Sequence, residues 1–251
     1  MYRVTRKPQV IAHRGFSGAF PENTLSAIIG AIELGVDMVE LDVRLSRDCV
    51  PVIFHNSSLT PIASCPRRVD QLTVFELKML DAGVWRGEEF RGERIPTLEE
   101  VLALTRGRIP LNLDIKDPAA IVPVIAAVRA HKMLDEVVLS GCQWAHARRV
   151  RQLEPRLHVL MNVDGYVRTL LRLISVRVAL LLSRMQAHTA QPAGLNIGHH
   201  YAAERFIRDA AALNLPVWTW TVDEPSRAQQ LARLGAVSIT SNWPDRIMLA
   251  L

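Results

Sequence analysis

The chain alternates short apolar segments with segments of helical periodicity over almost its whole length. Eight apolar segments are rich in Leu or β-branched residues and five to seven residues long, which is typical of strands covered on both faces: 9–14, 38–44, 110–115, 136–140, 157–161, 194–198, 217–221 and 236–240. The 251 residues show no linker or break in composition. This pattern predicts the α/β class, as one (β/α)8 TIM barrel spanning residues 1–251.

Helices are expected between these strands. The first follows Asn23, a favourable capping residue, and Gly35 is expected to end it. The periodicity predicts helices over 24–34, 118–131, 144–153, 165–186, 202–213 and 224–234.

One region breaks the repeat. Residues 49–54 form an additional strand-like run that ends on His55, and an irregular stretch continues to a helix that begins near Thr97. About fifty residues are too many for an ordinary connection between the second and third barrel strands. We therefore expect residues 56–96 to form a small insertion subdomain over one rim of the barrel.

The charge pattern narrows the possible partners. The formal charge of +5 and the pI near 9.5 would suit an anionic ligand, but the basic residues are scattered, so no nucleic-acid partner is expected. The most apolar tract, 170–183, contains Arg172 and Arg177 and is too short and too charged to span a bilayer. A buried helix is expected there, with contact to a membrane surface as the alternative. The oligomeric state stays open.

The cysteines and the N-terminus bear on the cellular location of the protein. Cys49, Cys65 and Cys142 have neither a CxxC spacing nor an even number, which argues against a disulfide framework or a structural zinc site. The first residues lack the apolar core of a signal peptide. A cytoplasmic location is expected.

Charged side chains occur at the ends of the first three predicted barrel strands. Chemistry in such barrels lies at the carboxyl ends of the strands. His13 and Arg14 end the first strand, and Lys116 ends the third. Glu40 and Asp42 are two residues apart on the second strand and therefore point to the same face.

The negative charges of these acids need a compensating partner, because the apolar residues between them indicate that the acids are buried. Val39, Leu41 and Val43 are expected to face the helices, which turns Glu40 and Asp42 into the barrel, with Asp114 on the next strand. Buried carboxylates cost several kcal/mol each unless cations or protons compensate them. Hard oxygen ligands favour one divalent cation, Mg²⁺ or Ca²⁺, over Zn²⁺. The alternative is an internal salt-bridge network with Arg14, Arg44 and Lys116.

Two of the eight histidines stand out. His13 and His55 each end a strand-like run near the carboxylates, whereas the others fit surface or rim positions. Two imidazoles beside one site can act as general acid and general base near neutral pH. Arg14 and Lys116 supply positive charge for a phosphoryl oxygen. Together these groups favour phosphoryl-ester chemistry.

An ordered set of motifs resembles the glycerophosphodiester phosphodiesterase family. The set consists of Ile11–Gly15, Pro21–Thr24, Val39–Val43, Val52–His55, Leu72–Leu77, Arg94–Glu100, Leu113–Lys116, Trp220–Val222 and Ile239–Asp245. It covers nearly the whole chain except residues 165–190.

The resemblance implies a metal-dependent hydrolase that cleaves small-molecule glycerophosphodiesters to sn-glycerol 3-phosphate and an alcohol. It implies acid–base roles for His13 and His55. The expected metal ligands are Glu40, Asp42 and Asp114, and the expected substrate contacts are Arg14, Lys116 and Trp220.

Three positions depart from the pattern that the resemblance implies. Asp114 stands where the family usually has Glu, Asn56 follows His55 where Asp is usual, and Ser241-Asn242 replaces a more common Thr-Asp. The shorter Asp114 would have to reach further toward a metal, and Asn56 would weaken any effect of a carboxylate on the tautomer or pKa of His55.

Two other functions remain open from the sequence. One is a lysophospholipase D-type or related phosphodiesterase that acts on lipids, motivated by tract 170–183 and the basic charge. The other is a catalytically silent barrel that binds phosphodiesters, motivated by Asp114 and Asn56.

Overall fold

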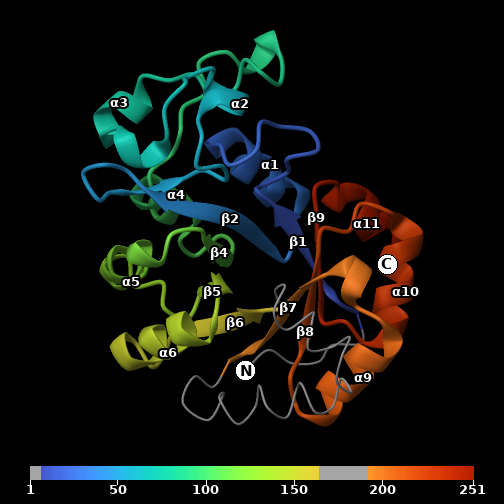
Figure 1. Cartoon of the computed structure of the whole chain (residues 1–251). Helices are drawn as coiled ribbons and strands as arrows, with labels where there is room; N and C mark the ends of the chain where they lie inside the picture. The colour runs from blue at the N-terminus through green and yellow to red at the C-terminus, as the bar shows by residue number, and fades with distance from the viewer. Residues whose placement is uncertain (1–6, 164–191) are drawn as a thin grey trace.

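The chain folds into a closed barrel with helices on its outside (Figure 1). In this computed structural model, which describes residues 7–163 and 192–251, eight parallel strands form the ring. They are β1 (Gln9–His13), β2 (Met38–Leu45), β4 (Leu111–Ile115), β5 (Val137–Cys142), β6 (His158–Asn162), β7 (Gly194–Gly198), β8 (Val217–Trp220) and β9 (Ser238–Ser241). All eight predicted strands are confirmed, with boundaries within two residues of the prediction.

β1 closes the ring because it pairs with strands from both ends of the chain. Its register with β2 aligns His13 with Glu40, and its register with β9 aligns Ala12 with Ser241. The residues that follow β1 and β9 therefore lie side by side at one end of the barrel, although they are separated by most of the sequence.

The two faces of the strands explain why they form a barrel. The outward side chains of β2, such as Val39 and Leu41, are buried in the cluster that joins the strands to the helices. Inside the ring, Ile11, Met38 and Trp218 belong to a second apolar cluster. Apolar residues thus fill part of the interior, which leaves the charged side chains at the carboxyl ends of the strands.

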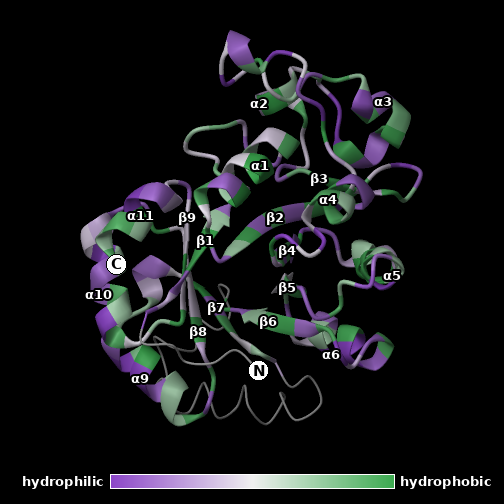
Figure 2. Cartoon of the chain, turned by 180° about the vertical axis from the view of Figure 1, so that it is seen from behind, coloured by the Kyte–Doolittle hydropathy of each residue, from purple (hydrophilic) through white to green (hydrophobic). Residues whose placement is uncertain are grey.

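The outer helices are amphipathic, and Figure 2 shows polar and apolar segments alternating along them. Their bounds are α1 (Leu25–Leu34), α5 (Ile121–Ala130), α6 (Trp144–Leu153), α9 (Glu204–Ala212), α10 (Pro225–Leu234) and α11 (Pro244–Ala250). Short 3-10 helices precede α5 and α9: η3 (Pro118–Ala120) and η4 (His199–Tyr201). The predicted helix 165–186 and the apolar tract 170–183 lie outside the described residues. Within the described part, no helix has the length and apolar character needed to cross a membrane.

The start of α1 corrects one prediction. Thr24, not Asn23, is the N-cap, and its side chain accepts a hydrogen bond from the amide of Ala27 at 3.3 Å. Asn23 is buried and directed toward β2 instead, because its side chain bonds Asp42. Gly35 ends the helix in a left-handed conformation, as expected.

The segment between β2 and β4 contains a small core of its own, although its last helix packs in the main core. It comprises β3 (Pro51–Ile53), which is antiparallel to β2, and then α2 (Thr60–Ala63), η1 (Val69–Gln71), α3 (Val74–Lys78), η2 (Glu88–Phe90) and α4 (Leu98–Thr105). Val52, Phe54, Leu59 and Leu77 belong to a cluster separate from the main core. Figure 1 shows α2 and α3 beyond α1 and β2. A subdomain boundary at 56–96 stays a prediction.

Candidate active site

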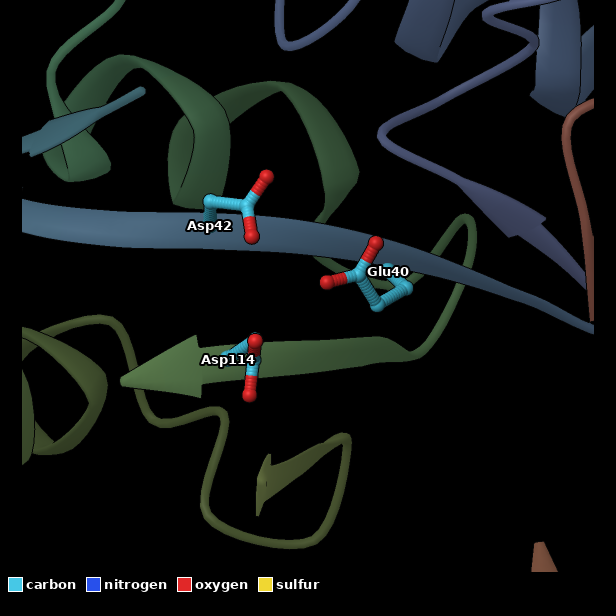
Figure 3. Close-up of side chains that lie close together, drawn as sticks. All are labelled: Glu40, Asp42 and Asp114. Carbon is cyan, nitrogen blue, oxygen red and sulfur yellow. The ribbon is translucent and has the colours of Figure 1, made fainter. Parts of the chain in front are cut away.

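Three carboxylates meet at the carboxyl ends of β2 and β4. Glu40 and Asp42 come from β2, Asp114 comes from β4, and the register aligns Asp42 with Asp114. Each residue offers one oxygen that lies within 4.8 Å of the oxygens of the other two. Figure 3 shows the three side chains close together, Glu40 and Asp42 on β2 and Asp114 on the neighbouring β4. Glu40 and Asp42 are buried, as the alternation on β2 predicted.

Two cations contact this cluster. The ammonium nitrogen of Lys116 is 2.9 Å from Asp42 Oδ1 and also bonds Asp114. Arg14 Nε is 3.3 Å from Asp42 Oδ2, and its Nη1 donates to both oxygens of Glu22 at 2.8 and 2.9 Å.

Arg44 does not take the place that the salt-bridge alternative gave it. Its Nε donates a hydrogen bond to the backbone oxygen of His55 at 2.8 Å. Of the three expected cations, only Arg14 and Lys116 therefore form ion pairs with the cluster in the described part of the chain.

The charges and donors of the site fit a hard divalent cation. The three carboxylates and Glu22 exceed the charges of Arg14 and Lys116 by two negative units, and the +2 charge of one such ion would balance this excess. Asn112 Oδ1 is also buried there and has no hydrogen-bond partner among the described residues. Carboxylate and amide oxygens are ligands that hard cations prefer. The acidic cluster can hold a metal ion.

The pKa values of the carboxylates reflect the same excess of negative charge. Burial, together with the negative charges of Asp42 and Asp114, raises the pKa of Glu40 well above its usual value. Burial alone would also raise the pKa of Asp42, but Lys116 and Arg14 outweigh it and hold that pKa below the usual value. Glu40 is therefore the acid whose charge most needs a cation.

His13 ends β1 directly beside Glu40. Its Nδ1 lies 2.6 Å from Asn242 Oδ1, and its Nε2 lies 3.8 Å from Glu40 Oε2. Burial, reinforced by the positive charge of Arg14, lowers the pKa of His13 to about 4. The imidazole is therefore neutral at pH 7 and has one ring nitrogen free to accept a proton.

His55 lies just after β3, which is antiparallel to β2. The amide of Phe54 donates to the backbone oxygen of Asp42 at 2.9 Å, which fixes the chain here. His55 Nδ1 lies 3.0 Å from Asn56 Oδ1, so an acceptor is present despite the absence of a carboxylate. Burial lowers the pKa of His55, and Asp42 opposes that shift. His55 is half-buried.

A cavity of about 140 Å³ opens at this end of the barrel. It is lined by His13, Arg14, Glu40, Asn112, Asp114, Lys116, Ser140, Asn162, Asn196, Trp220, Thr221 and Thr240. Six of the eight predicted site residues line it, while Asp42 and His55 lie outside the lining set. Trp220 remains 38% exposed, whereas Trp218 on the same strand face is 1% exposed.

Several polar lining residues escaped sequence reasoning. Ser140 on β5 donates to Asp114 Oδ1 at 3.0 Å, and Asn196 on β7 donates to Asn162 Oδ1 at 3.1 Å. Their signal was a polar residue near the carboxyl end of a predicted strand. Glu22 lay within a recognised motif, but its bond to Arg14 depends on how the loop after β1 turns.

A TIM barrel with buried acids, a neutral histidine and two cations at its mouth defines a class of phosphoryl-ester enzyme sites. Residues 13–246 match the family model of the "Glycerophosphoryl diester phosphodiesterase family". The chain belongs to this family.

Individual relatives match this chain over nearly their full lengths. A glycerophosphodiester phosphodiesterase from Caldanaerobacter subterraneus subsp. tengcongensis is 31% identical over 249 residues, covering 96% of this chain and 97% of that protein. An Oleispira antarctica phosphodiesterase, solved in complex with the product sn-glycerol-3-phosphate, is 30% identical with a TM-score of 0.86. The match covers 97% of this chain and 96% of that one. A glycerophosphodiester phosphodiesterase from Bacillus altitudinis is 26% identical over 245 residues, with 95% and 96% covered.

Proposed function

We propose that the chain hydrolyses glycerophosphodiesters to sn-glycerol 3-phosphate and an alcohol. The observation that carries the proposal is the buried cluster of Glu40, Asp42 and Asp114 beside the neutral imidazole of His13, at the mouth of one cavity. Family membership and the product complex of the Oleispira antarctica relative support the same reaction.

Glu40, Asp42 and Asp114 would hold one divalent cation, Mg²⁺ or Ca²⁺. When bound, such an ion offsets negative charge on the phosphoryl oxygens. Its proposed place follows from the two uncompensated negative charges and from the hard oxygen donors. Asp114 is held by Lys116 and Ser140, which gives the shorter side chain a defined orientation.

Arg14 and Lys116 bind the phosphate in this proposal. Both line the cavity, and both are anchored by carboxylates that keep their cationic ends near the acids. Burial would lower the pKa of Lys116, but Asp114 and Asp42 outweigh it and raise that pKa, so the ammonium stays charged at neutral pH. The exposed ring of Trp220 lies at the mouth, where it can pack against the glycerol carbons.

His13 and His55 carry the proton transfers. One imidazole removes a proton from the nucleophile, which is water or the neighbouring glycerol hydroxyl, and the other protonates the departing alkoxide oxygen. The sheet supports a shared role for the two histidines. His13 ends β1 and His55 lies just after β3, and both strands pair with β2, the strand that carries Asp42.

The test is a substrate and metal comparison with the full chain. Release of glycerol 3-phosphate from glycerophosphocholine should stop in EDTA and return when Mg²⁺ or Ca²⁺ is added. Lysophosphatidylcholine tests the lipid alternative, because a lysophospholipase D would prefer it over glycerophosphocholine. Binding of these diesters without turnover under any divalent ion would indicate a silent barrel and contradict the proposal.

A further inference from the structure

Asn242 and Asp223 form a hydrogen-bonded chain behind His13. Asn242 follows β9, and its side-chain nitrogen donates to Asp223 Oδ2 at 2.8 Å. Its side-chain oxygen lies 2.6 Å from His13 Nδ1. Neither Asp223 nor Asn242 has a role in the proposed function.

The carboxylate of Asp223 determines which end of the Asn242 amide faces His13. An ionised carboxylate only accepts hydrogen bonds, so the amide atom opposite it has to be the NH₂ group. The atom that faces His13 is then the amide oxygen, which also only accepts. His13 Nδ1 must therefore carry the hydrogen, and its Nε2 carries the lone pair.

Further contacts hold this arrangement in place. Asp223 Oδ1 accepts the backbone amide of Asn242 at 2.8 Å and the hydroxyl of Ser241 at 2.9 Å. On the other side, the amide of Gly18 donates to the backbone oxygen of Asn242 at 2.8 Å. A Cβ at Gly18 would lie 2.5 Å from that oxygen, so only glycine permits this approach.

The free nitrogen of His13 points toward the carboxylates. Nε2 is 3.8 Å from Glu40 Oε2, and His13 and Glu40 both line the cavity. A proton acceptor is thus presented to the cavity, while the protonated nitrogen is used for anchoring.

We propose that Asp223 and Asn242 are positioning residues that hold His13 in the tautomer protonated at Nδ1, so that Nε2 acts as the general base. This inference rests on the proposed function and assigns the role that was left open between the two histidines. His13 Nε2 takes the proton of the nucleophile, water or the neighbouring glycerol hydroxyl, as the new O–P bond forms. If the glycerol hydroxyl attacks, a water molecule must then open the cyclic phosphate to give glycerol 3-phosphate. The electron pair of the broken P–O bond goes to the alcohol oxygen, which takes its proton from protonated His55.

Exchanging the side chains of Asp223 and Asn242 distinguishes the positioning of His13 from simple packing. In Asp223→Asn, the new NH₂ group faces the NH₂ group of Asn242, so the Asn242 amide should turn over and present a donor to His13. We expect kcat to fall at least about 10- to 100-fold, the scale known for orienting partners of metal-ligating histidines, with KM changed less than about threefold.

The double variant Asp223→Asn/Asn242→Asp restores the direction of every side-chain bond in this chain. The new amide at position 223 would donate to the new carboxylate at position 242, and that carboxylate would accept from His13 Nδ1. We expect kcat within about fivefold of the wild type, which is less than the loss in the single variant. Ser241→Ala removes one bond to Asp223 but leaves the Asn242 amide oxygen facing His13, so it should lower kcat less than Asp223→Asn does.

The tautomer can be read directly without turnover. In ¹⁵N-histidine-labelled, metal-free full-length protein, His13 should show a pyrrole-like Nδ1 and a pyridine-like Nε2 signal, assigned by their loss in His13→Ala. The pattern should reverse in Asp223→Asn and return in the double variant. A wild-type His13 protonated at Nε2, or a double variant no better than Asp223→Asn, would overturn the inference. If the tautomer is as expected but no diester is hydrolysed, the proposed function fails instead.

Discussion

Asn23 links the loop after β1 to the carboxylate cluster. Its side-chain nitrogen donates to Asp42 Oδ2 at 2.8 Å, and its oxygen accepts the amide of Asp42 at 3.1 Å. The residue reaches this position with a φ of 59°, a left-handed conformation that asparagine tolerates better than most residues. Asn23 thus holds the most deeply buried acid of the site in one orientation.

Replacing Asn23 should separate the hydrogen bonds from the backbone conformation. Asn23→Gly keeps the conformation but removes both hydrogen bonds to Asp42, including the one that its buried backbone amide donates, so the free energy of unfolding should fall by about 1–3 kcal/mol. Asn23→Ala should lose about 1 kcal/mol more, because a Cβ disfavours positive φ. Urea denaturation in EDTA measures both. Equal losses for the two variants would contradict the strain argument.

Cys142 should be the least reactive cysteine. Burial, with a smaller contribution from Asp114, raises the pKa of its thiol to about 12, whereas Cys49 is exposed. The raised pKa keeps the thiol neutral at about pH 8, and the thiolate is the reactive form. A disulfide reagent at that pH should label Cys49 quickly and Cys142 only after denaturation. Rapid loss of the Cys142 thiol in the native Cys49→Ser variant would contradict this expectation.

Individual site residues differ in how far the sequence could reveal them. Glu40 and Asp42 were predictable because residues at alternate positions of a strand share one face, and the apolar residues between them turn that face into the barrel. The pairing of His13 with Asn242 was not, because these residues are 229 positions apart and meet only when β1 pairs with β9. Asn23 was misassigned because capping propensity is local, whereas the demand of Asp42 for a donor is tertiary.

At the level of elements, the strands were the most predictable feature. Each is short and apolar, and the helices and the barrel interior cover both of its faces, so the composition of each strand reports its environment. The end of α1 was equally predictable, because the signal for it is local. Gly35 adopts a φ of 77°, and its amide donates to the carbonyl oxygens of Ala31 and Ile32. The irregular segment between β3 and α4 has no periodicity, and the members of its separate core could not be identified from the sequence.

Substitutions at Gly35 would measure how much this local signal contributes to the stability of the fold. No atom lies within 4 Å of the position where its Cβ would be, so substitution changes only the backbone preference. Gly35→Ala should lower the free energy of unfolding by about 1 kcal/mol. Gly35→Asn should cost less, because asparagine tolerates the left-handed region. Thermal denaturation that ranks alanine above asparagine would contradict this explanation.

For the whole molecule, the acidic cluster predicts coupling between metal binding and stability. A divalent ion at about 100 times its dissociation constant should add about 2.7 kcal/mol. For a chain of this size, that corresponds to a Tm increase of about 5–10 °C. The increase should disappear in Asp114→Asn and Glu40→Gln, which each remove a proposed ligand.

The same variants also test the cause of the raised pKa of Glu40. In EDTA, Glu40→Gln should be at least as stable as the wild type, because the ionised form of Glu40 is disfavoured by burial and by its acidic neighbours. A metal-dependent Tm increase that persists in both variants would place the ion elsewhere.

The proposed hydrolysis of glycerophosphodiesters depends on His13 and the acidic cluster. The most direct measurement is the rate of glycerol 3-phosphate release from glycerophosphocholine by the metal-loaded wild type and by metal-loaded His13→Ala of equal thermal stability. We predict turnover by the wild type and a kcat about 10²–10⁴ lower for the variant, the usual scale for a general acid or base. Near-wild-type turnover by His13→Ala would contradict this role of His13.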